Sequence, residues 1–158
     1  MYGWLEKTLV GAIGIVEHDG KIINVYFDDC DEFKNKLSNG TIVVNQTPLL
    51  REAFRQLDEY LAGRLSEFLL PLEPQGTQFQ RNVWQALRQI PYGETASYKD
   101  IATMLGNPKA SRAVGMANNK NPIPILIPCH RIIGNNGNLV GYRGGLELKQ
   151  RLLEIEAG

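Results

Sequence analysis

A cysteine followed by a histidine ends the most rigid stretch of this 158-residue chain. The stretch reads Asn121-Pro122-Ile123-Pro124-Ile125-Leu126-Ile127-Pro128-Cys129-His130-Arg131. Its three prolines fix backbone φ and remove backbone donors, so an ordinary helix is excluded, and its apolar run indicates burial. A thiol at the rim of such a segment, beside a histidine and an arginine, is where a thiolate would be favoured, and the thiolate is the nucleophilic form. The residue types therefore make Cys129 a candidate nucleophile.

The alternative is a purely structural role, in which Cys129 is a small buried hydrophobic residue and His130 is a core residue. The only other cysteine, Cys30, lies in an acidic patch at residues 28–32 that disfavours a thiolate, and we expect it to be inert. Two cysteines supply neither a disulfide framework nor a four-cysteine zinc site. We accordingly expect a reducing, intracellular setting and no metal.

Composition and charge narrow the class of protein. With 43% apolar and 22% charged residues the chain is globular, and the apolar run at residues 9–16 is too short for a signal peptide or membrane span. The net charge of zero hides an asymmetry: residues 1–76 carry −5, whereas residues 77–158 carry +5. This pattern indicates that only the second half meets a polyanion. The glycine-rich residues 141–145 lack the spacing of a phosphate-binding loop, so no nucleotide cofactor is expected.

Residues 1–70 predict an N-terminal α/β domain. Strands at residues 10–16 and 22–27 flank an Asp19-Gly20 turn, and residues 41–44 predict a third strand. Thr47-Pro48 begins a helix that Gly63 ends. We expect a small antiparallel sheet with one helix, irregular structure with a helical turn at residues 28–38, and a linker at residues 71–76.

Residues 77–158 predict a mostly α-helical C-terminal domain. Thr77 caps a first helix, Ser97 and Asp100 form a capping box for a second, and Gly106-Asn107-Pro108 is a tight turn before a third helix at residues 110–118. Two short helices joined by such a turn predict a helix-turn-helix. Residues 146–156 predict a final helix with Leu148, Leu152 and Ile155 toward the core.

The second helix of this pair has an unusual composition. Arg112 is its one long charged side chain, and its small residues are Ala110, Ser111, Ala113, Gly115 and Ala117. A helix that reads the major groove needs several long polar side chains. This smooth surface instead predicts close approach to a minor groove, an inserted arginine and little sequence specificity.

Together these motifs resemble the O-6-alkylguanine-DNA alkyltransferases, the direct-reversal DNA repair proteins. The resemblance runs from about Phe79 to Glu156, and the first 70 residues match only in broad architecture. Besides the stretch that ends in Pro128-Cys129-His130-Arg131, the motifs in order are Pro91-Tyr92-Gly93-Glu94, Ser97-Tyr98, Gly106-Asn107-Pro108, Arg112-Ala113-Val114-Gly115, Gly141-Tyr142 and Gly144-Gly145.

The resemblance implies a ribonuclease H-like N-terminal domain, a winged-helix-like C-terminal domain and irreversible, stoichiometric alkyl transfer to Cys129. The substrate would be O-6-alkylguanine in a flipped-out base, with O-4-alkylthymine as a further candidate. His130 would take the thiol proton through a water, Glu156 would orient His130, and Asn121 would be a buried hinge. No cofactor is implied.

The resemblance also implies the partner, which is double-stranded DNA bound through its minor groove by a monomer. Tyr98 would help to rotate the target nucleotide and donate a hydrogen bond to the flipped base, and Arg112 would fill its place in the stack. The implied DNA and substrate contacts are Tyr98, Ala110, Ser111, Arg112, Ala113, Gly115, Pro124, Arg131, Ile132, Tyr142 and Arg143. Such a protein would act in the cytoplasm of a prokaryote or the nucleus of a eukaryote.

Three alternatives compete with this interpretation. A non-enzymatic alkyl-lesion-binding module would keep the helix-turn-helix and pocket but replace the cysteine, and Cys129 is present. A cysteine hydrolase needs a histidine that faces the thiol, and the other histidine, His18, lies in the predicted hairpin of the acidic half. A regulator with a fused zinc domain needs more cysteines than the chain has.

Overall fold

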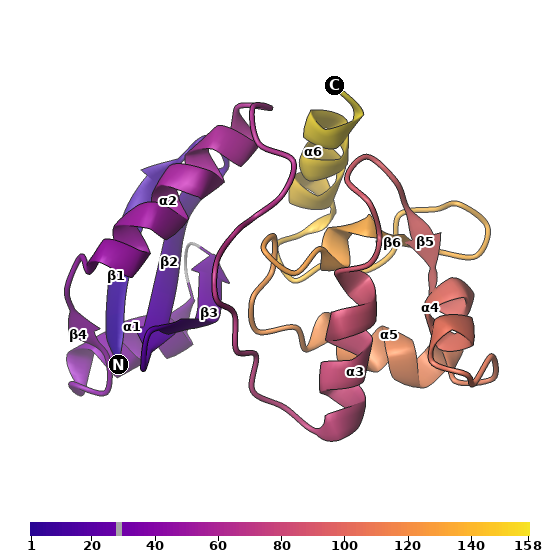
Figure 1. The fold of residues 1–158 in the computed structure, drawn as a ribbon, viewed down its shortest axis with the longest axis horizontal. Helices are drawn as coiled ribbons and strands as arrows, with labels where there is room; N and C mark the ends of the chain where they lie inside the picture. Colours follow the sequence, from indigo (N-terminus) through magenta and orange to yellow (C-terminus); the bar gives the residue numbers. More distant parts are fainter. Residues whose placement is uncertain (28–29) are drawn as a thin grey trace. The chain divides into compact units, whose positions relative to one another are not determined.

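The computed structural model describes residues 1–27 and 30–158 (Figure 1). They form two compact units, Met1–Pro74 and Gln75–Gly158. Part of the acidic patch predicted around Cys30, at residues 28–29, lies outside the described residues. Within them, no helix combines the length and the apolar character needed to cross a membrane.

The first unit contains a four-stranded sheet in the order β3-β2-β1-β4. Its strands are β1 (Tyr2–Thr8), β2 (Gly11–His18), β3 (Lys21–Phe27) and β4 (Val43–Val44). The first three pair antiparallel, but β4 pairs parallel to β1, so the sheet is mixed and the expectation of an antiparallel sheet was wrong. The reason is that helix α1 (Asp31–Ser38), which we expected to be only a helical turn, carries the chain from β3 to the opposite edge.

The hairpin between β2 and β3 is confirmed. Asp19 and Gly20 both have positive φ, 51° and 76°, and His18 pairs with Lys21 across the turn. Strand β1 was missed because Glu6 and Lys7 interrupt its apolar pattern, although all seven of its residues pair with β2.

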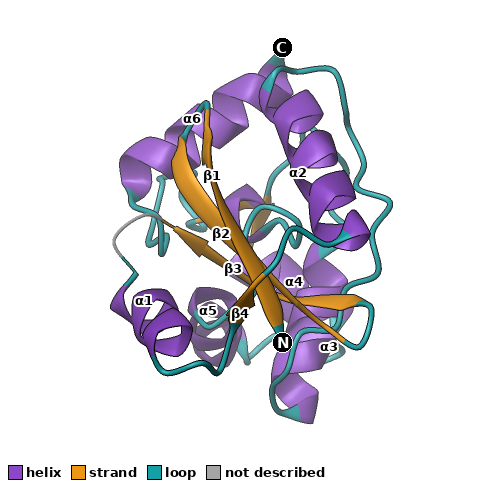
Figure 2. Ribbon diagram, turned by 90° about the vertical axis from the view of Figure 1, so that its left-hand side faces the viewer, coloured by secondary structure: helices purple, strands orange, loops and turns teal. Residues whose placement is uncertain are grey.

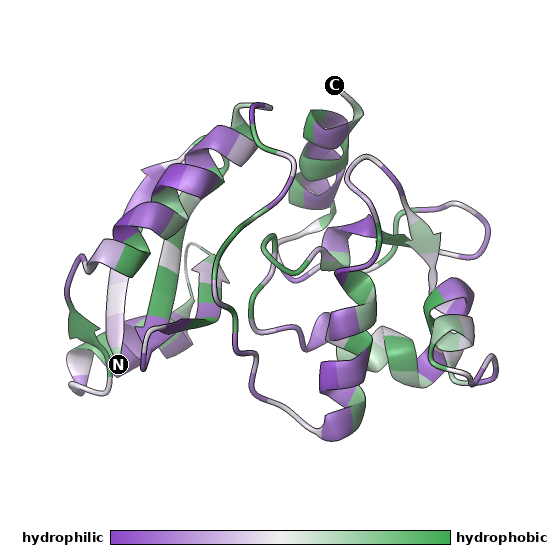
Figure 3. Cartoon of the chain, in the orientation of Figure 1, coloured by the Kyte–Doolittle hydropathy of each residue, from purple (hydrophilic) through white to green (hydrophobic). Residues whose placement is uncertain are grey.

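Helices cover both faces of this sheet (Figure 2). On one face lies α2 (Pro48–Leu61), whose N-cap residue Thr47 donates a hydrogen bond of 2.6 Å to Glu17 on β2. On the other face Phe33 of α1 packs so close to β2 that a Cβ at Gly14 would lie 2.6 Å from its ring. Hydrophobic and hydrophilic residues both recur along α2 (Figure 3). The hydrophobic ones follow the helical spacing of a single buried face, as in an amphipathic helix. Residues 71–73 also belong to this unit, since Ile22 exchanges backbone hydrogen bonds with Pro71 and Glu73.

The second unit is mostly helical. Its elements are α3 (Gln78–Leu87), β5 (Ala96–Ser97), α4 (Tyr98–Met104), α5 (Ser111–Asn119), the 3-10 helix η1 (Cys129–Arg131), β6 (Ile132–Ile133) and α6 (Leu146–Ala157). The cap at Thr77 and the capping box at Ser97 are confirmed, and Thr77 also forms a capping box, with Gln80. The helical pair α4–α5 with a tight turn at Gly106 is confirmed as well. The indole N–H of Trp84 on α3 donates a 2.8 Å hydrogen bond to the Ala117 carbonyl on α5 and so joins these helices.

Two features of this unit position its chemistry and were not predicted. Strands β5 and β6 pair in parallel, which brings the start of α4 beside the segment that follows Cys129. The buried face of α6 consists of Lys149, Leu152 and Glu156, whereas Leu148 and Ile155 are only half-buried. The expected apolar face was therefore partly wrong, because polar side chains with specific partners occupy it.

Candidate active site

Asn121 holds the proline-rich segment in one shape. Its buried side chain donates a hydrogen bond of 2.9 Å to the Ile127 carbonyl and accepts one of 3.0 Å from the Ile123 N–H. The turn between these residues places Ile125 at a φ of 72°, which is rare for a β-branched residue and costs about 1–3 kcal/mol. The two Asn121 bonds stabilise this backbone, and the segment enters η1 at Cys129 with a fixed direction.

The thiol of Cys129 is buried, with only 4% of the residue exposed. Burial raises its pKa to about 11, although the hydrogen bond from Asn121 and the charges of Lys149 and Arg143 act in the opposite direction. The expectation that a thiolate is favoured at the rim of the segment was therefore wrong. The thiol is neutral in this structure and needs a base to become a nucleophile.

His130, the next residue, is the candidate for this base. It is fully buried, and its Nε2 lies 2.6 Å from Glu156 Oε2. Burial lowers the pKa of His130, and the charges of Arg131 and Lys149 act in the same direction, whereas Glu156 raises it. The net lowering favours the neutral imidazole. Because a carboxylate only accepts hydrogen bonds, we assign the proton to Nε2, which leaves Nδ1 as the basic nitrogen.

Four donors hold the Glu156 carboxylate at the end of α6. In addition to His130, Arg131 donates from Nε to Oε1 at 2.8 Å and from Nη2 to Oε2 at 3.1 Å, and the Gly93 N–H donates to Oε1 at 3.2 Å. Arg131 also donates to the Ile90 carbonyl at 2.7 Å. A helix C-terminus disfavours an acid, and the guanidinium offsets this effect.

Lys149 is a further charge near the thiol. None of it is exposed, and its ammonium donates a 2.7 Å hydrogen bond to the Val140 carbonyl. Burial lowers the pKa of Lys149, while the charge of the Cys129 thiolate raises it. Lys149 and Cys129 therefore interact electrostatically, and the lysine favours the thiolate.

Tyr98, the first residue of α4, also lies near enough to Cys129 to interact with it electrostatically. Its half-buried ring packs against α5, where a Cβ at Gly115 would lie 3.5 Å from Cε1. Burial raises the pKa of the Tyr98 hydroxyl, and the negative charge that Cys129 carries as a thiolate would raise it further. The phenol is a neutral hydrogen-bond donor within electrostatic range of the thiol.

The exposed surface of α5 has one long cation and one long apolar side chain. Arg112 and Ala113 are exposed, and Ala110, Ser111 and Gly115 are half-buried. Met116 is 64% exposed. The surface is therefore less smooth than we expected, since the sequence interpretation left out this methionine.

Comparison with known proteins identifies the family. Residues 78–158 match the model described as the DNA binding domain of 6-O-methylguanine DNA methyltransferase. Residues 1–74 match the model of the ribonuclease-like domain of the same methyltransferase. This chain belongs to the O6-methylguanine DNA methyltransferase family.

Individual relatives agree with this assignment along almost the whole chain. The constitutive methylated-DNA–protein-cysteine methyltransferase of Bacillus subtilis is 47% identical over 158 residues, which cover 98% of this chain and 94% of the relative. The methylated-DNA–protein-cysteine methyltransferase of Methanosarcina acetivorans is 54% identical over 123 residues, covering 78% and 79%. A crystal structure of Mycobacterium tuberculosis OGT in complex with DNA has a TM-score of 0.89 at 40% identity, covering 99% of this chain and 93% of that one.

Within this methyltransferase fold, the predicted residues fall into two groups. One group lies together and consists of Cys129, His130, Glu156 and Asn121. Two features of this group were not predicted from the sequence: Lys149 lies near the thiol, and Arg131 bonds to Glu156. Arg131 and Ile132 were predicted to contact DNA or substrate. Both residues are buried in the structure. Glu156 and the Ile90 carbonyl hold the guanidinium of Arg131, and Ile132 is part of strand β6.

The remaining predicted contacts differ in exposure. Pro124 is buried, Tyr142 is half-buried and Arg143 is exposed, and Arg143 is near enough for its charge to lower the pKa of Cys129. The described residues contain no group of three His, Cys, Asp or Glu side chains suited to a metal ion. One signal for Lys149 was present in the sequence, since it precedes Leu152 and Glu156 by three and seven residues and therefore shares their helical face.

Proposed function

We propose that this chain removes the methyl group from O6-methylguanine in duplex DNA and keeps it as a thioether on Cys129. The observation that carries the proposal is the buried pair of Cys129 and the next residue, His130, whose imidazole is fixed by Glu156. In a member of this methyltransferase family, that arrangement supplies both the nucleophile and its base.

The reaction begins with the transfer of the thiol proton to Nδ1 of His130 through a water molecule. Glu156 stabilises the imidazolium that forms, and Arg131 holds the carboxylate in place through two hydrogen bonds. The positive charge of Lys149 stabilises the thiolate until it reacts. Activation thus takes place inside the protein, by a base on the residue next to the nucleophile.

In the second step the thiolate sulfur attacks the alkyl carbon, and the bond from that carbon to guanine O6 breaks. The electron pair of the broken bond stays on the guanine, where the Tyr98 hydroxyl donates a hydrogen bond. The guanine finally takes up the proton that the thiol released, so the reaction consumes no external acid or base. A thioether has no good leaving group, and each molecule therefore reacts once.

The target base must leave the duplex to reach a buried thiol. Extrusion costs a few kcal/mol, and less for a poorly paired lesion. We infer that α5 lies in the minor groove and that Arg112 occupies the vacated place in the stack. Pro124, Tyr142 and Arg143 would border the pocket that receives the base, and neutral Tyr98 would hold the base there.

The experiment that tests this function mixes the protein with a duplex that contains one O6-methylguanine and measures the nucleosides after digestion. We expect O6-methylguanine to be replaced by guanine, with an amplitude that saturates at one lesion per protein molecule. Tight binding of the lesion duplex without loss of O6-methylguanine would support the second candidate, a non-enzymatic lesion-binding module.

A further inference from the structure

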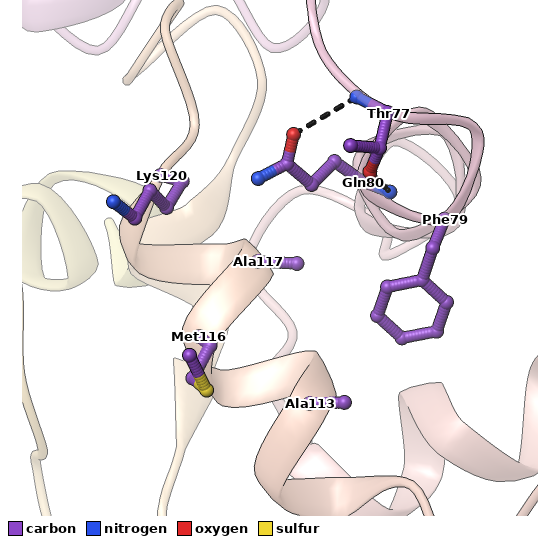
Figure 4. Close-up of a pocket in the computed structure, with 7 residues that line it drawn as sticks. All are labelled: Thr77, Phe79, Gln80, Ala113, Met116, Ala117 and Lys120. Atoms are coloured by element: carbon purple, nitrogen blue, oxygen red, sulfur yellow. Dashed lines mark hydrogen bonds between the residues drawn. The ribbon is translucent and has the colours of Figure 1, made fainter.

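A groove lies between the first turn of α3 and the exposed side of α5 (Figure 4). It has a volume of about 230 Å³ and is bordered by Phe79 and Gln80 on α3 and by Ala113, Met116, Ala117 and Lys120 on or after α5. In Figure 4, Ala113 and Ala117 point across the groove toward α3, and Lys120 lies at one end. None of these residues takes part in the alkyl transfer described above.

The walls of this groove are apolar and open. Phe79 is 38% exposed and Met116 is 64% exposed, and the two alanines add no polar atoms to the floor. Covering a large apolar side chain is favourable because it removes apolar surface from water. Two such side chains on one groove indicate a surface that gains free energy when a partner covers it.

The charges around the groove indicate which kind of partner would bind there. Neither α3 nor α5 contains an Asp or Glu, and Lys120 and Arg112 are both exposed. Residues 77–158 carry a net charge of +5. A partner with anionic groups beside apolar surface complements this groove, whereas an acidic or purely apolar protein surface matches only half of it.

Two N–H groups at the N-terminus of α3 are already bonded. Its capping box already uses the N–H groups of Thr77 and Gln80, which bond to each other's side chains at 3.0 and 3.1 Å. Lys120 is the cationic side chain that borders the groove, and its ammonium is suited to a phosphate.

We propose that this groove holds the sugar–phosphate backbone of one DNA strand, with a deoxyribose against Phe79 and Met116 and the adjacent phosphate at Lys120. The proposal rests on the proposed function for the identity of DNA as the partner. It extends the contact from α5, where Ala113 and Met116 follow Arg112 by one and four residues, to α3. A backbone contact of this kind strengthens binding to any duplex, whether or not it contains a lesion.

The test measures binding of a fluorescent, undamaged duplex by anisotropy at several salt concentrations. Met116→Ala and Phe79→Ala should each weaken binding about three- to ten-fold at every salt concentration without changing the salt slope, since no charge is lost. Lys120→Gln should weaken binding and reduce the slope of log K against log salt by about 0.9, the value for one phosphate contact. An unchanged melting temperature shows that each variant is folded.

Matched controls come from α6. Leu146 is 49% exposed and Arg151 is exposed, and neither borders the groove. Leu146→Ala and Arg151→Gln should therefore bind the duplex as the wild type does. Equal losses in these variants would mean that the effects at the groove are not specific, and the proposal would fail.

Two further outcomes overturn the proposal without touching the proposed function. Wild-type affinity in all three groove variants, with wild-type removal of O6-methylguanine, would show that DNA does not use the groove. A self-association measured by sedimentation that Met116→Ala abolishes, with duplex affinity unchanged, would show that a second copy of the chain occupies it. Failure of the proposed function would look different, because the wild type itself would leave O6-methylguanine in place.

Discussion

The two units of this chain differ in the polar side chains that they bury and in what those side chains do. In the described part of the first unit the buried polar or charged residues are Glu17 and Gln56, and each serves a structural purpose. Glu17 accepts a hydrogen bond from the N-cap residue Thr47, and Gln56 exchanges hydrogen bonds with the backbone of Leu69. Otherwise this unit is an apolar core between a sheet and two helices.

The second unit instead buries Asn118, Asn121, His130, Arg131, Lys149 and Glu156. Burying charges is costly unless they are paired, so a network of this size indicates chemistry more than stability. The two cysteines follow the same division. Cys30 packs, half-buried, against the apolar cluster of the first unit, whereas Cys129 adjoins the charged network of the second.

The largest effect expected is the loss of the nucleophile. Cys129→Ala should abolish alkyl transfer while the variant still binds a lesion duplex, because the residues of α5 that we propose to contact DNA are unchanged. Cys30→Ala is the matched control and should transfer at the wild-type rate. Intact-protein mass spectrometry and an electrophoretic mobility shift measure the two properties, and residual transfer by Cys129→Ala would place the nucleophile elsewhere.

Glu156→Gln should reduce the transfer rate about 100-fold, since general base catalysis contributes about 10²–10⁴-fold and a neutral amide no longer stabilises the imidazolium. The buried Arg131 also loses its ionic partner, and we expect stability to fall by about 3–5 kcal/mol. Glu154→Gln, on the exposed side of the same helix, is the control. Single-turnover kinetics and urea denaturation are the measurements, and a wild-type rate in Glu156→Gln would contradict the role of the carboxylate.

Lys149→Met should slow transfer about ten-fold at neutral pH, the effect of roughly one pKa unit in the thiol. The sign follows from the structure, because Lys149 lowers the pKa of Cys129 and its removal raises that pKa. The deficit should therefore shrink as the pH rises toward the thiol pKa. A profile of the transfer rate against pH tests this expectation. A deficit that is the same at every pH would mean that Lys149 only has a structural role, as the hydrogen-bond donor to the Val140 carbonyl.

Phe33→Ala should have the smallest effect on transfer and a clear effect on stability. Phe33 is buried against Tyr26, with ring centroids 5.1 Å apart, and its removal should destabilise the first unit by about 3–5 kcal/mol. Under conditions where the variant remains folded, its transfer rate should equal that of the wild type. A rate that falls in proportion to stability would show that the first unit also controls the chemistry.

Local signals predicted much of this fold. The Asp19-Gly20 hairpin and the caps at Thr47, Thr77 and Ser97 depend on neighbouring residues alone, and the structure confirms them. Strand β1 and the parallel pairing of β4 depend on distant partners, and the sequence pattern did not reveal them.

The same limit applies to the active site. The sequence predicted a partnership of His130 and Glu156 only through the family resemblance, because 26 residues separate them. The family resemblance implied that Arg131 contacts DNA or substrate, and only the fold shows that Glu156 holds it. The burial that raises the thiol pKa is likewise a property of the packed unit and not of the residues next to Cys129.

The central claim is that the chemistry belongs to the second unit and to one thiol. The most direct measurement is the mass of the intact protein and of its peptides after reaction with a duplex that contains one O6-methylguanine. We predict a gain of a single methyl group, located on Cys129, that does not increase with excess DNA. A methyl group on Cys30, or no gain in mass despite binding of the lesion, would contradict the account.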